Sequence, residues 1–363
     1  MGKKNIVLFF TLLGLLAFSG AYIAGGVQAF SRFQQDNLEQ QEHCGGQAPV
    51  QICVQAPRAI FSAFYPFYLS TQYPLFKVSY SSNTPLTLVI STSINHFSQA
   101  QTRTVSATST TQTSSFSPPL LDSNVLRKLT TEASSLLQVQ VTDTKNHLYY
   151  RDDIPLVLHS RWMMRWLPSH RLNIGAWVTP ADPAVASLVV KASEHLGEQA
   201  APAPPGMIGY RNATPQQVID QVDAIYDALR LDYHIHYVQA TIPYNATGDD
   251  NSSTQLIKLP SEVLQQRSGM CIELTALLAS ALEHIGLHTE IIIIPGHAFL
   301  GVSTTEDGQQ QQYWDASSIN NNVAADSANV QANHLYEQNL KQHSILDTIT
   351  LSDARKAHVG PML

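Results

Sequence analysis

The sequence predicts an α+β protein in three parts: an apolar N-terminal segment, an antiparallel β-sandwich, and a C-terminal domain in which a cysteine-bearing helix packs on an antiparallel sheet. Three observations predict this division. Residues 5–31 carry no charge. Residues 70–165 repeatedly alternate apolar and polar side chains, which is the period of a half-buried strand. After Pro168 the apolar residues recur at helical spacing.

The composition is that of a folded protein that does not bind nucleic acid. The 363 residues suffice for two ordinary domains. Hydrophobic residues make up 44% of the chain, so a packed core is feasible and disorder is not expected. The net charge is −7 and there are no basic runs, which argues against a nucleic-acid partner.

Residues 1–30 are predicted to be a signal anchor or a signal peptide. Lys3 and Lys4 precede a strongly apolar stretch at 6–23. A membrane-spanning helix needs about 20 such residues, whereas a secretory core needs only about 7–15, so the length favours an uncleaved anchor. The alternative is cleavage after Ala29, where small residues have the right spacing. In either case we expect the lysines to stay inside and the rest of the chain to be exported. The protein would then cross the cell membrane once with its C-terminal part outside, or it would be secreted after cleavage near Ala29.

Export gives the three cysteines a predicted division of roles. Cys44 and Cys53 lie nine positions apart in a polar, Gly-Gly-containing segment, which we assign to a linker at 31–69. In an oxidising compartment we expect them to form a local disulfide; the alternative is two unpaired thiols. Cys271 is then left as the odd thiol.

Residues 70–167 are predicted to form an immunoglobulin-like antiparallel sandwich. Apolar residues alternate with polar ones at 76–80, 86–90 and 137–141, with turn signals between these stretches. The Ser/Thr-rich stretch 102–116 is interpreted as a strand with polar loops. No catalytic set of residues occurs here, so we expect a structural or binding role.

Residues 168–363 are predicted to be a second domain of helices and short strands. Asp182-Pro183 and Thr214-Pro215 have the pattern of helix starts. A helix is indicated from Cys271 to Ile285. Strands follow at 290–294 and 298–303, and a third short strand follows at 313–316.

Three residues of this domain carry the chemistry that we predict. Cys271 lies at the first turn of its helix, where the dipole and the free N–H groups favour a thiolate and can bind an oxyanion. His297 lies at a strand start and Asp315 on the next strand, so that His297 can deprotonate Cys271 while Asp315 orients the imidazole. Gln265 is the candidate for a second oxyanion donor. The alternative is that Cys271 and His297 are ordinary core residues.

The motifs around these residues resemble the transglutaminase-like superfamily. The resemblance rests on the run 260–273 with Gly269-Met270-Cys271, on Gly296-His297 and on Trp314-Asp315, and it is specific over about residues 255–317. It implies a papain-like α+β core and a catalytic triad of Cys271, His297 and Asp315. Members of the superfamily include protein cross-linkers, deamidases, peptidases or amidases, and members with no known activity.

The expected function is extracytoplasmic amide chemistry through a cysteine thioester, either hydrolysis or acyl transfer. The substrate would be a protein or a peptide, such as one of the cell envelope. The N-terminal helix would attach the chain to the membrane. The mechanism requires no cofactor and no metal. One alternative is a non-catalytic binding or assembly module with the same fold. Another is a metal-binding sensor, in which His234 and His236 converge with a carboxylate.

Overall fold

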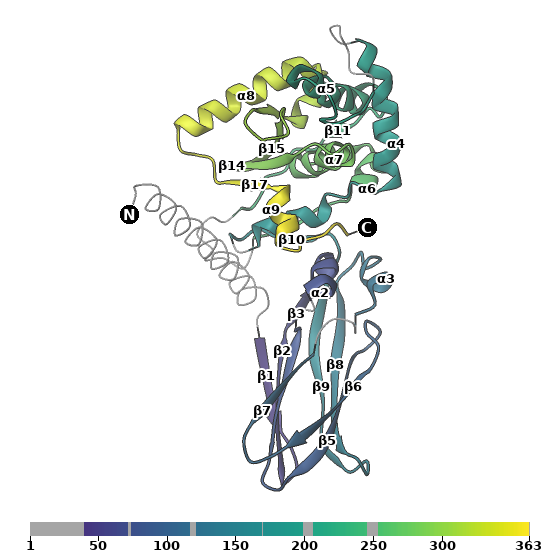
Figure 1. Cartoon of the computed structure of the whole chain (residues 1–363), viewed down its shortest axis with the longest axis vertical. Helices are drawn as coiled ribbons and strands as arrows, with labels where there is room; N and C mark the ends of the chain where they lie inside the picture. Colours follow the sequence, from purple (N-terminus) through teal and green to yellow (C-terminus); the bar gives the residue numbers. More distant parts are fainter. Residues whose placement is uncertain are drawn as a thin grey trace, which may run out of the picture.

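The computed structural model describes residues 40–71, 74–116, 121–168, 170–198, 206–244 and 253–362. The N-terminal part forms an elongated unit of strands, called here the β unit. The C-terminal part forms a unit of helices and short strands, called here the mixed unit (Figure 1). The mixed α+β class predicted from the sequence is confirmed. The predicted anchor or signal peptide at 1–30 lies outside the described residues. Within the described ranges, no helix is both long enough and apolar enough to span a bilayer.

The β unit consists of two sheets. The first has the order β1-β2-β4-β7, and all its pairs are antiparallel. The second has the order β3-β9-β8-β5-β6, in which β3 pairs parallel to β9 and the other pairs are antiparallel. The strands of the first sheet are β1 (Gln40–Gly45), β2 (Val50–Pro57), β4 (Phe76–Ser82) and β7 (Gln112–Phe116). Those of the second are β3 (Ala59–Phe61), β9 (Leu148–His159), β8 (Ala133–Asp143), β5 (Leu86–Ile94) and β6 (Gln101–Ala107).

Alternating apolar residues line the inner face of each sheet. Val54 of β2, Ile90 of β5 and Val141 of β8 are all fully buried, and all belong to one hydrophobic cluster. Because side chains alternate between the faces of a strand, the polar residues between them face outward. The β unit also contains the short helices α2 (Tyr65–Thr71) and α3 (Ser123–Leu126) and the 3-10 helix η1 (Ser62–Phe64).

The boundaries of the β unit differ from those predicted. The linker expected at 31–69 is wrong where the structure describes it, because Gln40–Gly45 and Val50–Pro57 are strands of the first sheet. In β2, Val50, Ile52, Val54 and Ala56 are buried at every second position. The Gly-Gly-Pro composition that suggests a linker belongs to the turn of this hairpin. The Ser/Thr-rich stretch forms β6 and β7, which are two strands rather than one.

The mixed unit is built on an antiparallel sheet with the order β16-β15-β14-β17. Its strands are β14 (Thr289–Ile294), β15 (His297–Ser303), β16 (Gln311–Trp314) and β17 (Asp347–Thr350). β14 lies between β15 and β17, and its residues Ile291, Ile292 and Ile293 are fully buried. Because both faces of this central strand are covered, the run has no polar face. Two smaller pairs join β10 (Met163–Arg165) with β12 (Thr254–Leu256), antiparallel, and β11 (His236–Tyr237) with β13 (Ser268–Gly269), parallel.

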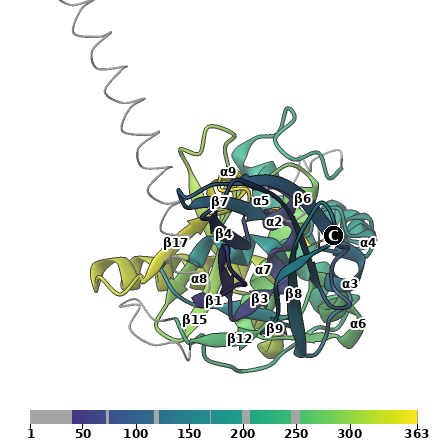
Figure 2. The ribbon, with the colours of Figure 1, turned by 90° about the horizontal axis from the view of Figure 1, so that it is seen from below.

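Helices surround this sheet. They are α4 (Pro183–Ala192), α5 (Pro215–Leu231), α6 (Pro260–Gln266), α7 (Cys271–His284), α8 (Ala325–Lys341) and α9 (Leu351–Lys356), with 3-10 helices η3 (Arg171–Trp177), η4 (Ser193–Glu198) and η5 (Ala316–Asn321). The predicted start signals act as helix caps: the Asp182 side chain accepts a hydrogen bond from Ala184 N, and Thr214 forms a capping box with Gln217. Seen from below (Figure 2), α8 extends outward past the strands of the β unit.

The two units touch through α2, the strand end of β9 and the C-terminal tail. The Tyr65 hydroxyl of α2 donates to the carbonyl of Met362, and the Phe64 and Trp177 rings meet edge to face at 6.2 Å. Just after β9, Arg161 Nη2 lies 2.5 Å from Glu262 Oε1 at the start of α6. The end of the β unit is therefore bonded directly to the helix that precedes the predicted nucleophile.

Candidate active site

Cys271 is the first residue of α7 and is a free, buried thiol with 1% of its surface exposed. The segment before it is tied to the helix by Glu273. One Glu273 oxygen accepts from Met270 N at 2.9 Å, and the other accepts from Lys258 N at 2.8 Å. Glu273 is 1% exposed, and both of its carboxylate oxygens accept hydrogen bonds from the backbone. At this position the unpaired N–H groups of the first turn can bind an oxyanion that forms next to Cys271.

His297 and Asp315 lie together next to this helix start. His297 begins β15 and pairs with Ile294 of β14, while Asp315 directly follows β16. His297 Nε2 is 2.8 Å from Asp315 Oδ2, and Asp315 Oδ1 accepts from Ser317 N at 2.9 Å as the cap of η5. Cys271 lies close enough to His297 to influence the pKa of the imidazole. The structure thus brings the three predicted residues into one group.

The charge of His297 is set by these partners. Burial by itself lowers the pKa of His297, but the hydrogen bond to Asp315 and the interactions with Asp315 and Cys271 outweigh burial and raise this pKa to about 10. The imidazole is therefore protonated at neutral pH. A protonated imidazole next to a thiol favours the thiolate, which is the nucleophilic form of cysteine.

A segment at 238–244, called here the covering segment, contacts Cys271 and the strand start that bears His297. The carbonyl oxygen of Ala240 lies 4.0 Å from Cys271 Sγ, and Ile242 N donates to the carbonyl of Gly296 at 3.3 Å. Gly296, next to His297, has a positive φ of 75°, and an added Cβ there would lie 3.2 Å from the Thr241 side chain. This close approach explains why the Gly-His pair has glycine at that position.

Both ends of the covering segment are bonded to the rest of the mixed unit. At the start, Val238 N donates to the carbonyl of Gly269 at 2.8 Å. At the end, the Tyr244 hydroxyl donates to Asp347 Oδ2 at 2.8 Å, and Asp347 also pairs with Arg171. The covering segment is therefore held at both ends next to the thiol.

Tyr237 is a residue of this site that sequence reasoning missed. Burial raises the pKa of its phenol, and the charges of Cys271 and Asp315 raise it further. Its backbone is held by Asn320, whose amide donates to Tyr237 O and accepts from Tyr237 N, both at 2.6 Å. The sequence around Tyr237 looks like a loop, and only the long-range pairing of β11 with β13 places it beside Cys271.

Gln265 is not brought to the site. It is exposed on α6, and among the hydrogen bonds of the described residues none joins it to Cys271, His297 or Asp315. The side-chain amide that contacts the loop before Cys271 belongs to Gln255 of β12. Its nitrogen lies 3.6 Å from Met270 Sδ, and its oxygen accepts from Trp166 Nε1 at 2.9 Å. The spacing of six residues before Cys271 does not reveal this, because α6 ends at Arg267 in a left-handed turn.

His234 and His236 are both exposed, and His236 lies on β11. In the described ranges, one group of three possible metal ligands has atoms within 4.8 Å of one another, namely Glu42, Cys44 and Cys53. The two histidines are not part of it. The sulfur atoms of that group are bonded to each other, so they offer no thiolate to an ion.

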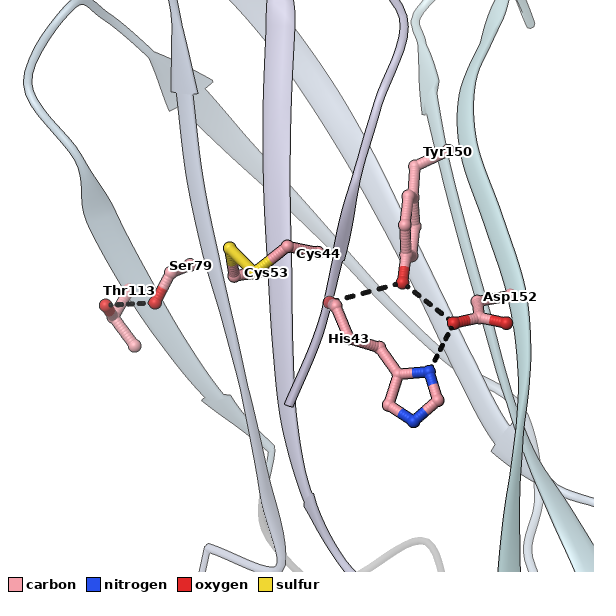
Figure 3. The surroundings of a disulfide bond; sticks show 7 residues. All are labelled: His43, Cys44, Cys53, Ser79, Thr113, Tyr150 and Asp152. Carbon is pink, nitrogen blue, oxygen red and sulfur yellow. Dashed lines mark hydrogen bonds and ion pairs between the residues drawn. A yellow bond between two sulfur atoms is a disulfide. The ribbon is translucent and has the colours of Figure 1, made fainter. Parts of the chain in front are cut away.

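Cys44 and Cys53 form a disulfide between β1 and β2 (Figure 3). The two residues face each other directly in the antiparallel register, with their Cα atoms 4.1 Å apart. Beside the disulfide, His43 Nδ1 lies 2.9 Å from Asp152 Oδ2, and the Tyr150 hydroxyl donates to the same oxygen at 3.1 Å (Figure 3). The disulfide lies in the β unit and has no part in the site around Cys271.

A helix-borne thiol next to a histidine–carboxylate pair, on a mixed α+β fold, is an arrangement typical of cysteine-based acyl chemistry. Residues 217–350 match the family model of the transglutaminase-like superfamily. This part of the chain is therefore a transglutaminase-like superfamily domain, as the sequence motifs predict. It extends from α5 to the end of β17 and contains Cys271, His297 and Asp315. No curated protein and no solved structure matches the chain.

Proposed function

We propose that the chain is a thiol-dependent enzyme that acts on carboxamide or peptide bonds of proteins and peptides. The observation that carries this proposal is the His297–Asp315 pair, with Cys271 close enough to influence the imidazole, at a helix start within the transglutaminase-like domain. Thiolate, imidazolium and carboxylate then have the roles of nucleophile, general acid–base and orienting group in a papain-like core.

The reaction has two halves. In the first, Cys271 Sγ attacks the carbonyl carbon, the C–N bond breaks, and His297 gives its proton to the leaving amine. The product is a thioester on Cys271. In the second, His297 takes a proton from water or from an acceptor amine, which attacks the thioester and restores the thiol. The N–H groups at the start of α7 stabilise the oxyanion in both halves.

We place this activity outside the cytoplasm, with the chain held at the membrane by its N-terminal segment or released after cleavage near Ala29. The Cys44–Cys53 disulfide supports an oxidising compartment, because such bonds are rare in cytosolic proteins. Lys3 and Lys4 before an apolar stretch support export. The substrates are then proteins or peptides of the cell envelope or of the extracellular medium.

The test uses the fact that Cys271 is the one cysteine of the chain outside a disulfide. The full chain is alkylated with iodoacetamide over a range of pH, and intact mass gives the rate. We expect alkylation at Cys271 to persist well below the usual thiol pKa of about 8.5, and His297→Ala to restore an ordinary thiol profile. An ordinary profile in the unmodified chain, unchanged by His297→Ala, would overturn the proposal.

A second measurement separates hydrolysis from transfer. A protected glutaminyl-glycine dipeptide is supplied with hydroxylamine, and hydroxamate and ammonia are quantified. Both products indicate transfer, ammonia alone indicates hydrolysis, and Cys271→Ala must abolish each. Release of neither product from this dipeptide, together with no new peptide ends from denatured casein, counts against amide chemistry.

One observation favours a second candidate, a non-catalytic binding or assembly module. Cys271 is 1% exposed and lies under Ala240, so the site is closed in this state. If the module interpretation holds, Cys271→Ala leaves the affinity for a cell-envelope partner unchanged, and the thiol stays unreactive in the folded chain.

A further inference from the structure

We propose that Asp223 of α5 is a positioning residue for Asp315, acting through the Trp314 indole. This inference rests on the proposed function, because it assigns to Asp223 the task of holding the carboxylate that orients His297. Asp223 touches neither the thiol nor the imidazole, and it lies 91 residues before its indole partner in the sequence.

The link from Asp223 to Trp314 is direct and buried. Trp314 Nε1 donates to Asp223 Oδ1 at 2.8 Å, the indole is fully buried, and Asp223 is 4% exposed. A buried indole N–H needs an acceptor, because in the interior it has no water to replace a lost partner. The hydrogen bond therefore fixes β16 against α5.

β16 needs such a restraint because it is short and lies at the edge of its sheet. It has four residues and pairs only with β15, where Trp314 is opposite Leu300. On its outer side α8 contributes one bond to its backbone, from Asn329 Nδ2 to Tyr313 O at 3.0 Å. The Trp314 side chain adds the restraint closest to Asp315.

Asp315 has no freedom to compensate for a shift of β16. One carboxylate oxygen faces His297 Nε2 and the other accepts from Ser317 N, so both oxygens are already engaged. If the end of β16 moves, Asp315 must give up one of these two contacts. The contact with Ser317 also caps η5. The contact with His297 is therefore the one that would break.

The surroundings of Asp223 make this restraint dependent on pH. Burial raises the pKa of Asp223, the Trp314 hydrogen bond lowers it, and the nearby carboxylates of Asp227 and Asp220 on α5 and of Asp326 on α8 raise it; the balance is a pKa of about 7. The carboxyl thus gains its charge near neutrality, and the charged form is the stronger acceptor for the indole.

The test compares two variants at Asp223. In Asp223→Asn the amide oxygen can still accept from Trp314 Nε1, whereas in Asp223→Leu nothing can. Tyr226→Phe is the matched control: Tyr226 lies one turn further along α5, and its buried hydroxyl has no hydrogen-bond partner among the described residues. The readouts are the titration of His297 by NMR of the histidine-labelled chain, the pH profile of Cys271 alkylation, and thermal unfolding.

We expect Asp223→Leu to lower the pKa of His297 and to slow alkylation of Cys271 at mildly acidic pH by about tenfold or more, since small misplacements of catalytic groups cost this much. Asp223→Asn should retain most of the alkylation rate while losing any inflection near neutral pH. Tyr226→Phe should match the unmodified chain. This pattern separates positioning from general destabilisation, because Asp223→Asn keeps the acceptor for the indole and with it the reactivity of Cys271.

The proposal is overturned if a folded Asp223→Leu chain keeps the His297 titration and the alkylation profile of the unmodified chain. If Asp223→Leu does not fold, Trp314→Phe replaces it, because the ring remains and the donor is lost, and the same outcomes apply. An unreactive Cys271 in the unmodified chain counts against the proposed function alone. The His297 titration still decides whether Asp223 positions Asp315.

Discussion

His297 Nε2 and Asp315 Oδ2 lie 2.8 Å apart, although His297 begins β15, Asp315 directly follows β16, and 18 residues separate them in sequence. The register of the two strands makes this contact possible. Leu300 is opposite Trp314, so Asp315 lies just beyond the paired region, toward the end of β15 where His297 is found. A shift of one residue would turn the side chains to the other face and separate the pair.

The first prediction concerns this pair. Asp315→Asn removes the charge that helps to hold the proton on His297, so we expect Cys271 alkylation at mildly acidic pH to slow by about tenfold or more. Asp307→Asn, in an exposed turn, is the control for loss of one carboxylate. Equal rates for Asp315→Asn and the unmodified chain would show that Asp315 does not act on the imidazole.

The second prediction concerns stability and pH. The folded chain raises the pKa of His297 from 6.5 to about 10, so the folded state holds a proton that the unfolded state releases. The resulting stabilisation is fully present below about pH 6.5 and is lost as the pH rises through about 10. Urea unfolding over this range should show a steeper loss of stability for the unmodified chain than for His297→Gln. Parallel curves for the two chains would contradict this.

The third prediction concerns the disulfide. Replacing both Cys44 and Cys53 by serine should lower the free energy of unfolding of the β unit by about 2–3 kcal/mol, the entropy expected for a loop of this length. Reducing agent should lower the stability of the unmodified chain and leave the double variant unchanged. Cys271 alkylation should be the same in both, because the disulfide lies outside the site.

The fourth prediction concerns the covering segment. Tyr244→Phe removes its hydrogen bond to Asp347. Losing one such bond costs about 1 kcal/mol, so the segment opens more often and Cys271 alkylation should speed up about fivefold. Tyr149→Phe, in the β unit, is the matched control. If Tyr244→Phe reacts no faster than the control, the Asp347 contact does not hold the site closed.

Local patterns in the sequence predict the elements of the site well. The caps at Asp182 and Thr214, the helix from Cys271 and the all-apolar strand Ile291–Ile294 follow from side-chain period and capping chemistry, and the structure has each of them. These features depend on neighbours within a few residues, which the sequence displays directly.

Features set by distant parts of the chain were missed. The parallel pairs β3–β9 and β11–β13 join segments far apart in sequence, and nothing in the local pattern marks them. For the same reason Tyr237 and Asp223 could not be assigned to the site. The spacing from Cys271 favours Gln265 as an oxyanion donor, but the left-handed turn at Arg267 keeps it away from the site. The strand at Val50–Pro57 could have been predicted, because its alternation is visible in the sequence.

The place of the disulfide has a mechanical consequence. β1 is the first described strand, and it lies at the edge of its sheet, where β2 is its one strand partner; Gln41 and His43 also bond to β9. A pulling force applied through residues 1–39 would act on Gln40 and peel β1 from β2 one backbone pair at a time. The covalent bond at Cys44 stops this peeling after the first four residues and passes the load to β2 in the interior of the sheet. A chain tethered by its N-terminal segment would therefore keep its β unit intact under tension.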